Sequence, residues 1–263
     1  MGEDKNTPIL GKKIFFLHPS VLVQNEIVTE LAQLEHEVYV VRDEDRLAKV
    51  LRAYADAIVF CSVDETLSPQ KWEAWIRKIM GDEATRSVSI GILSNGNDDE
   101  VRRLYLNTLG VSCGFVCVKA EKNALIKTLS DILKAAEAKG RRKYLRADTR
   151  NEALTTLNLS RDGRFINGDI QDISVVGLSC VFERDPELEK NSVVSDVQLK
   201  LQSTLLKVEG VVFGSRTDAG GAKVYVIVFA PKMDPSVRPK IRAFIQKHLQ
   251  TKMDVELGHN TSR

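Results

Sequence analysis

The chain has 263 residues, of which 43% are hydrophobic and 28% are charged, and its formal net charge is +2. This length is enough for two ordinary domains, and the composition is typical of folded globular proteins rather than of disordered chains. The small net charge argues against a surface devoted to nucleic acid, so we expect no direct nucleic-acid binding. Recognition of an anion must then come from a local cluster of basic residues.

The location that the sequence favours is a reducing cytoplasm. No apolar run approaches the length of a membrane-spanning helix, and the first residues, MGEDKNTPILGKK, lack the apolar stretch of a signal peptide. The cysteines lie scattered in apolar stretches, where we expect buried free thiols rather than a zinc site. They are Cys61, Cys113, Cys117 and Cys180.

The first 140 residues alternate between short apolar runs and helical patterns. The expected strands are 13–17, 37–41, 57–61, 88–93 and 114–118. The expected helices are 21–34, 44–55, a long helix that begins at Ser68 and carries Trp72 and Trp75 on an apolar stripe, 98–109 and 121–138. Apolar strands that alternate with amphipathic helices indicate an α/β domain with a parallel sheet covered on both faces. Five such units predict a flavodoxin-like, five-stranded sheet.

From about Leu154 the pattern changes to strands that are separated by turns. The expected strands are 154–159, 164–173, 177–182, 197–201, 205–213 and 222–229, followed by a helix over 236–253. Six strands without intervening helices predict an all-β, antiparallel barrel. Because the basic run 141–150 lies between the two patterns, we predict an α/β domain over 1–139 and a barrel domain with a C-terminal helix over 140–263.

The order of elements in residues 1–139 resembles the receiver domain of bacterial two-component systems. Receivers place an acidic pair after the first strand and a phosphorylated aspartate at the end of the third. Here these places hold Leu17-His18-Pro19 and Cys61. Ser94 and Lys119 match the hydroxyl and the lysine that end the fourth and fifth strands of receivers.

Without the carboxylates, these side chains form neither a Mg²⁺ cage nor an acyl-phosphate acceptor. We expect Asp64, three residues past Cys61, to belong to the following loop rather than to replace the acceptor. The resemblance therefore implies a degenerate receiver that serves as a platform for interaction or dimerisation with an unidentified protein partner.

Two short motifs in the second half of the chain carry the functional prediction. Arg142 and Arg146 are four residues apart in RRKYLR, and DISVVG supplies Asp172, Ser174 and Gly177. An arginine binds phosphate oxygens with two donors, matches guanine O6 and N7, and stacks on a purine. An ionised aspartate accepts hydrogen bonds from guanine N1 and N2. Ser174 is expected on the same side of a strand as Asp172, and a glycine at 177 permits a turn and close approach of a ligand.

The two motifs, Arg-x-x-x-Arg and Asp-x-Ser-x-x-Gly, resemble the ligand-binding motif of PilZ domains, which bind the bacterial second messenger cyclic di-GMP. The resemblance covers roughly residues 141–229 and matches all five motif positions. It implies a cyclic di-GMP receptor without a further cofactor, in which the ligand orders residues 141–150 and re-orients the barrel against the receiver-like domain. The ligand-binding residues that it implies are Arg141, Arg142, Arg146, Asp172, Ser174 and Gly177. A side chain at position 141 that can stack implies two intercalated ligands per site.

Other functions remain as alternatives. Alone, RRKYLR also fits a solvated linker, and Asp172 and Ser174 also fit a turn before Gly177. The protein would then be a ligand-independent adaptor that contacts protein partners. A phosphorylation-controlled regulator of nucleic acid is disfavoured by the missing acidic pair, and an enzyme by the lack of a recognisable nucleophile–base pair or Gly-rich phosphate loop. The PilZ resemblance implies control of motility, adhesion or virulence.

Overall fold

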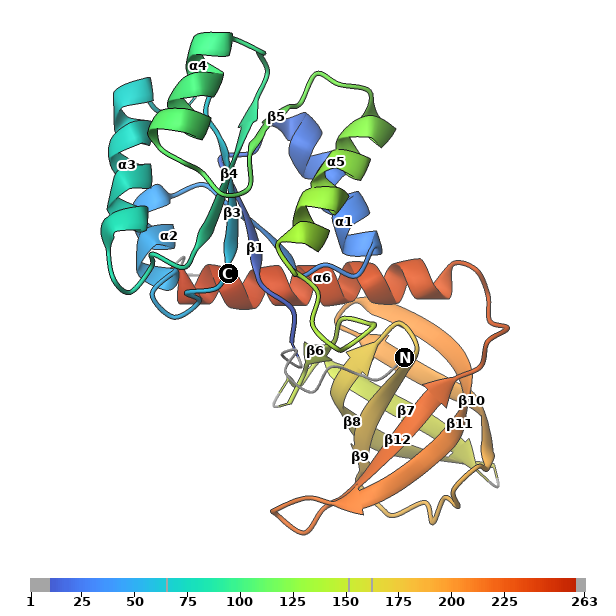
Figure 1. Cartoon of the computed structure of the whole chain (residues 1–263). Coiled ribbons are helices and arrows are strands. Elements are labelled where there is room, and N and C mark those ends of the chain that lie inside the picture. The colour runs from blue at the N-terminus through green and yellow to red at the C-terminus, as the bar shows by residue number, and fades with distance from the viewer. Residues whose placement is uncertain (1–9, 65, 151, 162, 259–263) are drawn as a thin grey trace. The chain divides into compact units, whose positions relative to one another are not determined.

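The computed structural model describes residues 10–64, 66–150, 152–161 and 163–258 and forms two compact units. The first unit combines the chain up to Lys143 with the chain from Leu249 onward, and the second unit spans Tyr144–His248. The structure thus divides the chain after Lys143 and again after His248, whereas the sequence predicts one boundary near Gly140. Figure 1 shows a parallel sheet with helices in the first unit and a barrel in the second.

The first unit contains a five-stranded sheet in the order β2-β1-β3-β4-β5, in which neighbouring strands are parallel. The strands are β1 (Ile14–Leu17), β2 (Val38–Val41), β3 (Ile58–Ser62), β4 (Ser89–Ser94) and β5 (Phe115–Cys117). The chain order reverses between β1 and β3, which makes their carboxyl ends the switch point of a doubly wound sheet. The predicted flavodoxin-like arrangement is confirmed.

Helices cover both faces of this sheet (Figure 1). They are the π-helical segment η1 (Val23–Val28), α1 (Thr29–Gln33), α2 (Glu44–Val50), α3 (Pro69–Gly81), α4 (Asp99–Arg103), the π-helical segment η2 (Leu104–Thr108) and α5 (Lys122–Ala135). Phe16 packs toward η1, α1 and α5, and Phe15 packs toward α2 and α3, because successive strand residues face opposite sides. Trp72 and Trp75 are buried in the core on the α2 and α3 side, as predicted.

Helix α6 (Val237–Glu256) contributes residues to both units. In the first unit, Met253 and Leu257 are buried in the core on the α2 and α3 side. The side-chain amide of Gln250 accepts a hydrogen bond from the Val40 N–H at 2.9 Å and donates one to the Val40 carbonyl at 3.0 Å. Because β2 lies at the edge of the sheet, Gln250 pairs backbone groups of Val40 that the sheet does not use.

The second unit is an antiparallel sheet in the order β6-β8-β7-β10-β11-β12-β9, which closes through the pairing of β8 with β9. Its strands are β6 (Ala147–Asp148), β7 (Thr155–Arg161), β8 (Arg164–Ser174), β9 (Gly177–Phe182), β10 (Val193–Leu201), β11 (Thr204–Thr217) and β12 (Lys223–Phe229). Along β11, Leu206, Val208 and Val212 are buried and alternate with exposed residues, as a barrel wall requires. The predicted six-stranded barrel with a following helix is confirmed, and the short strand β6 is an addition to it.

All four cysteines are free, and three of them are buried: Cys61, Cys113 and Cys180. Cys117 is partly exposed. Among the helices of the described residues, none combines the length and the apolar character that a membrane crossing requires.

Candidate functional site

The short strand β6 brings the two sequence motifs together. It pairs antiparallel with the end of β8, so that Asp148 lies opposite Asp172. Arg146, the residue before β6, donates a hydrogen bond from Nη1 to Oδ1 of Asp172 at 3.1 Å. Two side chains that lie 26 residues apart in the sequence therefore form an ion pair on the outside of the barrel.

The second oxygen of Asp172 is held by the neighbouring strand. Ser179 lies opposite Asp172 in the β8–β9 ladder, is buried, and donates its hydroxyl hydrogen to Oδ2 of Asp172. One carboxylate oxygen thus faces Arg146 and the other faces β9. Sequence reasoning missed Ser179, although a two-residue hairpin between Ser174 and Gly177 places residue 179 opposite residue 172.

Ser174 and Gly177 shape the hairpin that carries Asp172. They are paired at its end, so the turn itself is formed by residues 175–176. The Ser174 hydroxyl donates to the Gly177 carbonyl at 3.1 Å and accepts from the Val176 N–H at 3.4 Å. A Cβ on Gly177 would lie 2.5 Å from the carbonyl oxygen of Ile227, so the absence of a side chain lets β9 approach β12. Sequence reasoning instead assigned the glycine to a turn and to ligand approach.

The structure brings four of the six predicted site residues together within the second unit: Arg146, Asp172, Ser174 and Gly177. Arg141 and Arg142 are exposed and precede Tyr144, at which the second unit begins. They belong to the first unit and are therefore not assigned to this cluster.

A second ion pair lies next to the first. Arg146, Asp148 and Arg150 are exposed, whereas Ala147 and Thr149 between them are buried, so the three charged side chains share the outer face. Arg150 donates from Nε to Oδ1 of Asp148 at 2.9 Å and from Nη2 to Oδ2. These hydrogen bonds and the charge of Asp148 raise the pKa of the Arg150 guanidinium further above its usual value. Sequence reasoning missed Asp148 and Arg150, although their alternate spacing after Arg146 is a signal for a shared face.

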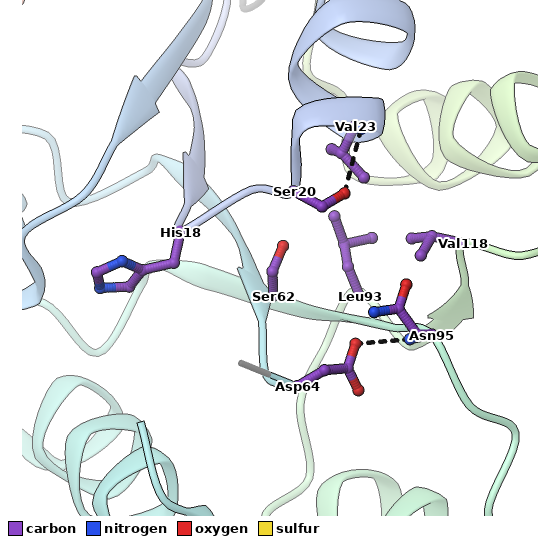
Figure 2. Close-up of a pocket in the computed structure, with 8 residues that line it drawn as sticks. All are labelled: His18, Ser20, Val23, Ser62, Asp64, Leu93, Asn95 and Val118. Atoms are coloured by element: carbon purple, nitrogen blue, oxygen red, sulfur yellow. Dashed lines mark hydrogen bonds between the residues drawn. The ribbon is translucent and has the colours of Figure 1, made fainter. Parts of the chain in front are cut away.

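The first unit has a small polar pocket at the carboxyl ends of its strands, and Figure 2 shows its lining. The cavity has a volume of about 20 Å³, which is room for one water molecule. Asp64 accepts from the Ser94 hydroxyl at 2.8 Å and from the Asn95 N–H at 2.6 Å. The residues that line the pocket are His18, Ser20, Val23, Ser62, Asp64, Leu93, Asn95 and Val118.

The residues at the positions that define a receiver differ from one another in their contacts and in their exposure. The His18 ring points away from Asp64 (Figure 2), and its Nε2 lies 2.9 Å from Oε2 of Glu44. Cys61 is completely buried, and this burial raises the pKa of its thiol. Asp64 lies in the loop after β3, as predicted, and Lys119 is exposed. Within the described part of the chain, no three His, Cys, Asp or Glu side chains form a group that could hold a metal ion.

Comparison with known families identifies the second unit. The second unit is a closed antiparallel barrel with charged motif residues gathered at one hairpin. Residues 140–247 match the family model of the PilZ domain, so this part of the chain is a PilZ domain. The match is to a binding domain and indicates no enzyme family. A comparison with curated protein sequences finds no match.

Solved structures resemble parts of the chain. The PilZ domain of YcgR from Escherichia coli, described with c-di-GMP, has 13% sequence identity and a TM-score of 0.37, over 45% of this chain and 98% of that chain. The inhibitor of motility MotI/DgrA from Bacillus subtilis has 14% identity and a TM-score of 0.37, over 43% of this chain and 53% of that chain. The chemotaxis protein CheY4 from Vibrio cholerae has 14% identity and a TM-score of 0.39, over 47% of this chain and 99% of that chain.

Proposed function

We propose that this protein is a cytoplasmic, non-catalytic receptor for cyclic di-GMP. The observation that carries the proposal is the ion pair of Arg146 with Asp172, at 3.1 Å, inside the residues that match the PilZ domain. Arginine and aspartate are the two side chains best suited to a ligand that combines phosphates with guanines. Arginine recognises the phosphate oxygens and the Hoogsteen edge, and aspartate accepts from the Watson–Crick edge.

The exposure of the ion pair makes its two partners available to a ligand. The Arg146 side chain is 49% exposed and that of Asp172 is 28% exposed. A surface ion pair of this kind stabilises the fold by only about 0–1 kcal/mol. A good two-donor contact between an arginine and a guanine contributes about 1–3 kcal/mol. An incoming guanine or phosphate therefore replaces Asp172 as the partner of Arg146 with a net gain.

The remaining motif residues complete the site in this proposal. Arg142 supplies a second guanidinium, and Arg141 stacks on a base, so that two ligands intercalate in one site. Ser174 and Gly177 hold the hairpin that presents Asp172, through the hydrogen bonds and the close packing of β9 described above. Because Arg146 and strand β6 already have partners in the structure, the segment that ligand binding orders in this proposal is residues 141–145. Binding also changes the arrangement of the two units, which requires that the ligand bind one arrangement more tightly than another.

The receiver-like unit acts as the platform for a protein partner. Cys61 stands at the expected phosphoacceptor position and is buried, which favours a unit that does not accept a phosphoryl group. The alternative, a ligand-independent adaptor, shares this platform and differs only in the barrel. A titration with cyclic di-GMP separates the two functions, because the adaptor gives no binding heat.

The proposal is tested by isothermal titration of the full chain with cyclic di-GMP, with GTP and cyclic di-AMP as comparison ligands. We expect cyclic di-GMP alone to bind tightly, with two ligands per chain. Arg142→Ala, Arg146→Ala and Asp172→Ala should each weaken binding at least about tenfold, because a lost two-donor contact is worth about 1–3 kcal/mol. Arg216→Ala, which changes an exposed arginine on β11, is the matched control and should bind as the wild type does. Unchanged affinity in both arginine variants of the motif would refute the site, and a single ligand per chain would refute the intercalated dimer.

A further inference from the structure

The outer face of β6 places two carboxylates directly opposite each other. Asp148 on β6 is the register partner of Asp172 on β8. Like charges at directly opposed positions of a sheet destabilise the pair. The pairing of β6 with β8 therefore requires that cations lie close to both carboxylates.

Two arginines meet this requirement, and they divide the carboxylates between them. Arg146 contacts Asp172 through one hydrogen bond, from Nη1 to Oδ1. Arg150 contacts both oxygens of Asp148, with Nε at 2.9 Å from Oδ1 and 3.2 Å from Oδ2, and with Nη2 on Oδ2. Two-point contacts between arginine and carboxylate are stronger and geometrically more specific than single contacts. The arginine outside the PilZ motif thus makes the firmer pair.

Asp148 lies between the two arginines on one face of the chain. Arg146 precedes it by two residues and Arg150 follows it by two, and alternate residues of an extended segment share a face. If Arg150 were absent, Arg146 would be the nearest guanidinium on this face. Arg146 would then have two carboxylates as neighbours, Asp148 and Asp172, and an anionic ligand would have to displace both.

We propose that Arg150 is a positioning residue of the ligand site, which acts by holding Asp148 and so leaves Arg146 free to exchange Asp172 for an anionic ligand. This inference rests on the proposed cyclic di-GMP function. The four side chains sum to zero formal charge, and removal of Arg150 makes the sum −1 beside the place where the two phosphates of the ligand must approach. Salt screens this repulsion only in part, because the charged groups lie within a Debye length of about 10 Å at 0.1 M salt.

The inference is tested by titrating cyclic di-GMP into the full-length Arg150→Ala, Asp148→Asn and Asp148→Asn/Arg150→Ala variants, with Arg216→Ala as the control. We expect Arg150→Ala to weaken binding roughly tenfold, in line with the loss of about one good arginine contact. Asp148→Asn should bind at least as tightly as the wild type, and the double variant should return to within about twofold of the wild-type affinity. Thermal unfolding of each variant checks that the barrel remains folded.

Each outcome decides between positioning and the other roles of Arg150. If Arg150→Ala binds as the wild type does, the inference is wrong. If the double variant stays as weak as Arg150→Ala, then Arg150 contacts the ligand itself and does not act through Asp148. A wild-type chain that binds no cyclic di-GMP refutes the proposed function instead. In that event, the side-chain nitrogen resonances of Arg146, recorded without ligand, still test whether Arg150 keeps Asp148 away from Arg146. A shift of these resonances in Arg150→Ala that the double variant reverses supports the inference. If the resonances do not shift in Arg150→Ala, the inference is wrong.

Discussion

The replacement of Gly177 with alanine tests whether this motif position serves the barrel or the ligand. The new Cβ would lie 2.5 Å from the carbonyl oxygen of Ile227 and 3.2 Å from the Cα of Val228. Both contacts are with backbone atoms of β12, the strand with which β9 pairs through Gly177 and Val228. The clash can therefore be relieved only by moving one strand against the other.

The size of the effect follows from the cost of overpacking. An added methyl group that forces a backbone shift destabilises a protein by about 1–3 kcal/mol. For a unit of about 100 residues, each 1 kcal/mol lowers the unfolding midpoint by about 4–8 °C. We expect Gly177→Ala to lower the midpoint of the barrel unit by about 4 °C or more and to speed hydrogen exchange of the amides in β9 and β12.

Gly214→Ala is the matched control. Gly214 lies on β11 of the same barrel, and a Cβ there would meet no heavy atom within 4 Å. Surface substitutions of this kind change stability by about 0.5 kcal/mol or less. Calorimetry of the full chain and hydrogen exchange measure the two variants side by side. If Gly177→Ala unfolds at the wild-type temperature and yet loses affinity for cyclic di-GMP, the packing explanation is refuted and ligand approach is the reason for the glycine.

Two further predictions concern the first unit. Burial and, to a smaller extent, the charge of Lys139 lower the pKa of His36 to about 4, so the unfolded chain takes up a proton on acidification before the folded chain does. The free energy of unfolding, measured with urea, should therefore fall by about 2 kcal/mol between pH 7.5 and pH 5. His36→Gln should lack this pH dependence. An equal pH dependence in both proteins would show that His36 is not its cause. Both oxygens of Asp64 accept hydrogen bonds beside a cavity of about 20 Å³, so acetyl phosphate with Mg²⁺ should transfer no label to the protein. Labelling that Asp64→Asn abolishes would show that Asp64 is an acceptor after all.

The sequence predicts the long elements of this fold well because their patterns are local. Short continuous apolar runs between helical patterns indicate the parallel strands. Apolar residues at every second position indicate the barrel strands, as along β11. The strand β6 has no such pattern, since it comprises only Ala147–Asp148 and forms because β8 pairs with it. A two-residue strand depends on a partner distant in the sequence, and hydrophobic periodicity does not report such a partner.

The motif comparison identified Arg146 and Asp172 as candidate site residues, but it identified neither their ion pair nor the side chains around that pair. Ser179, Asp148 and Arg150 act through strand register and alternate spacing, which become visible once the hairpin and β6 are known. Helix α6 shows the same limit, because its pattern indicates an apolar face but not the surface that the face covers. The sequence pattern does not show that Met253 packs in the core of the first unit.

Because the end of α6, from Leu249 onward, belongs to the first unit, the barrel is an insertion within the sequence of the α/β unit. Residues 144–248 separate the first 143 residues from the segment that completes their core. During synthesis from the N-terminus, Met253 and Leu257 emerge only after the whole barrel. The core of the α/β unit can therefore be completed only after the barrel has been synthesised. A chain cut after Lys143 would leave the edge of β2 without Gln250, and the core on the α2 and α3 side without Met253 and Leu257. The unit that begins first is therefore the unit that finishes last.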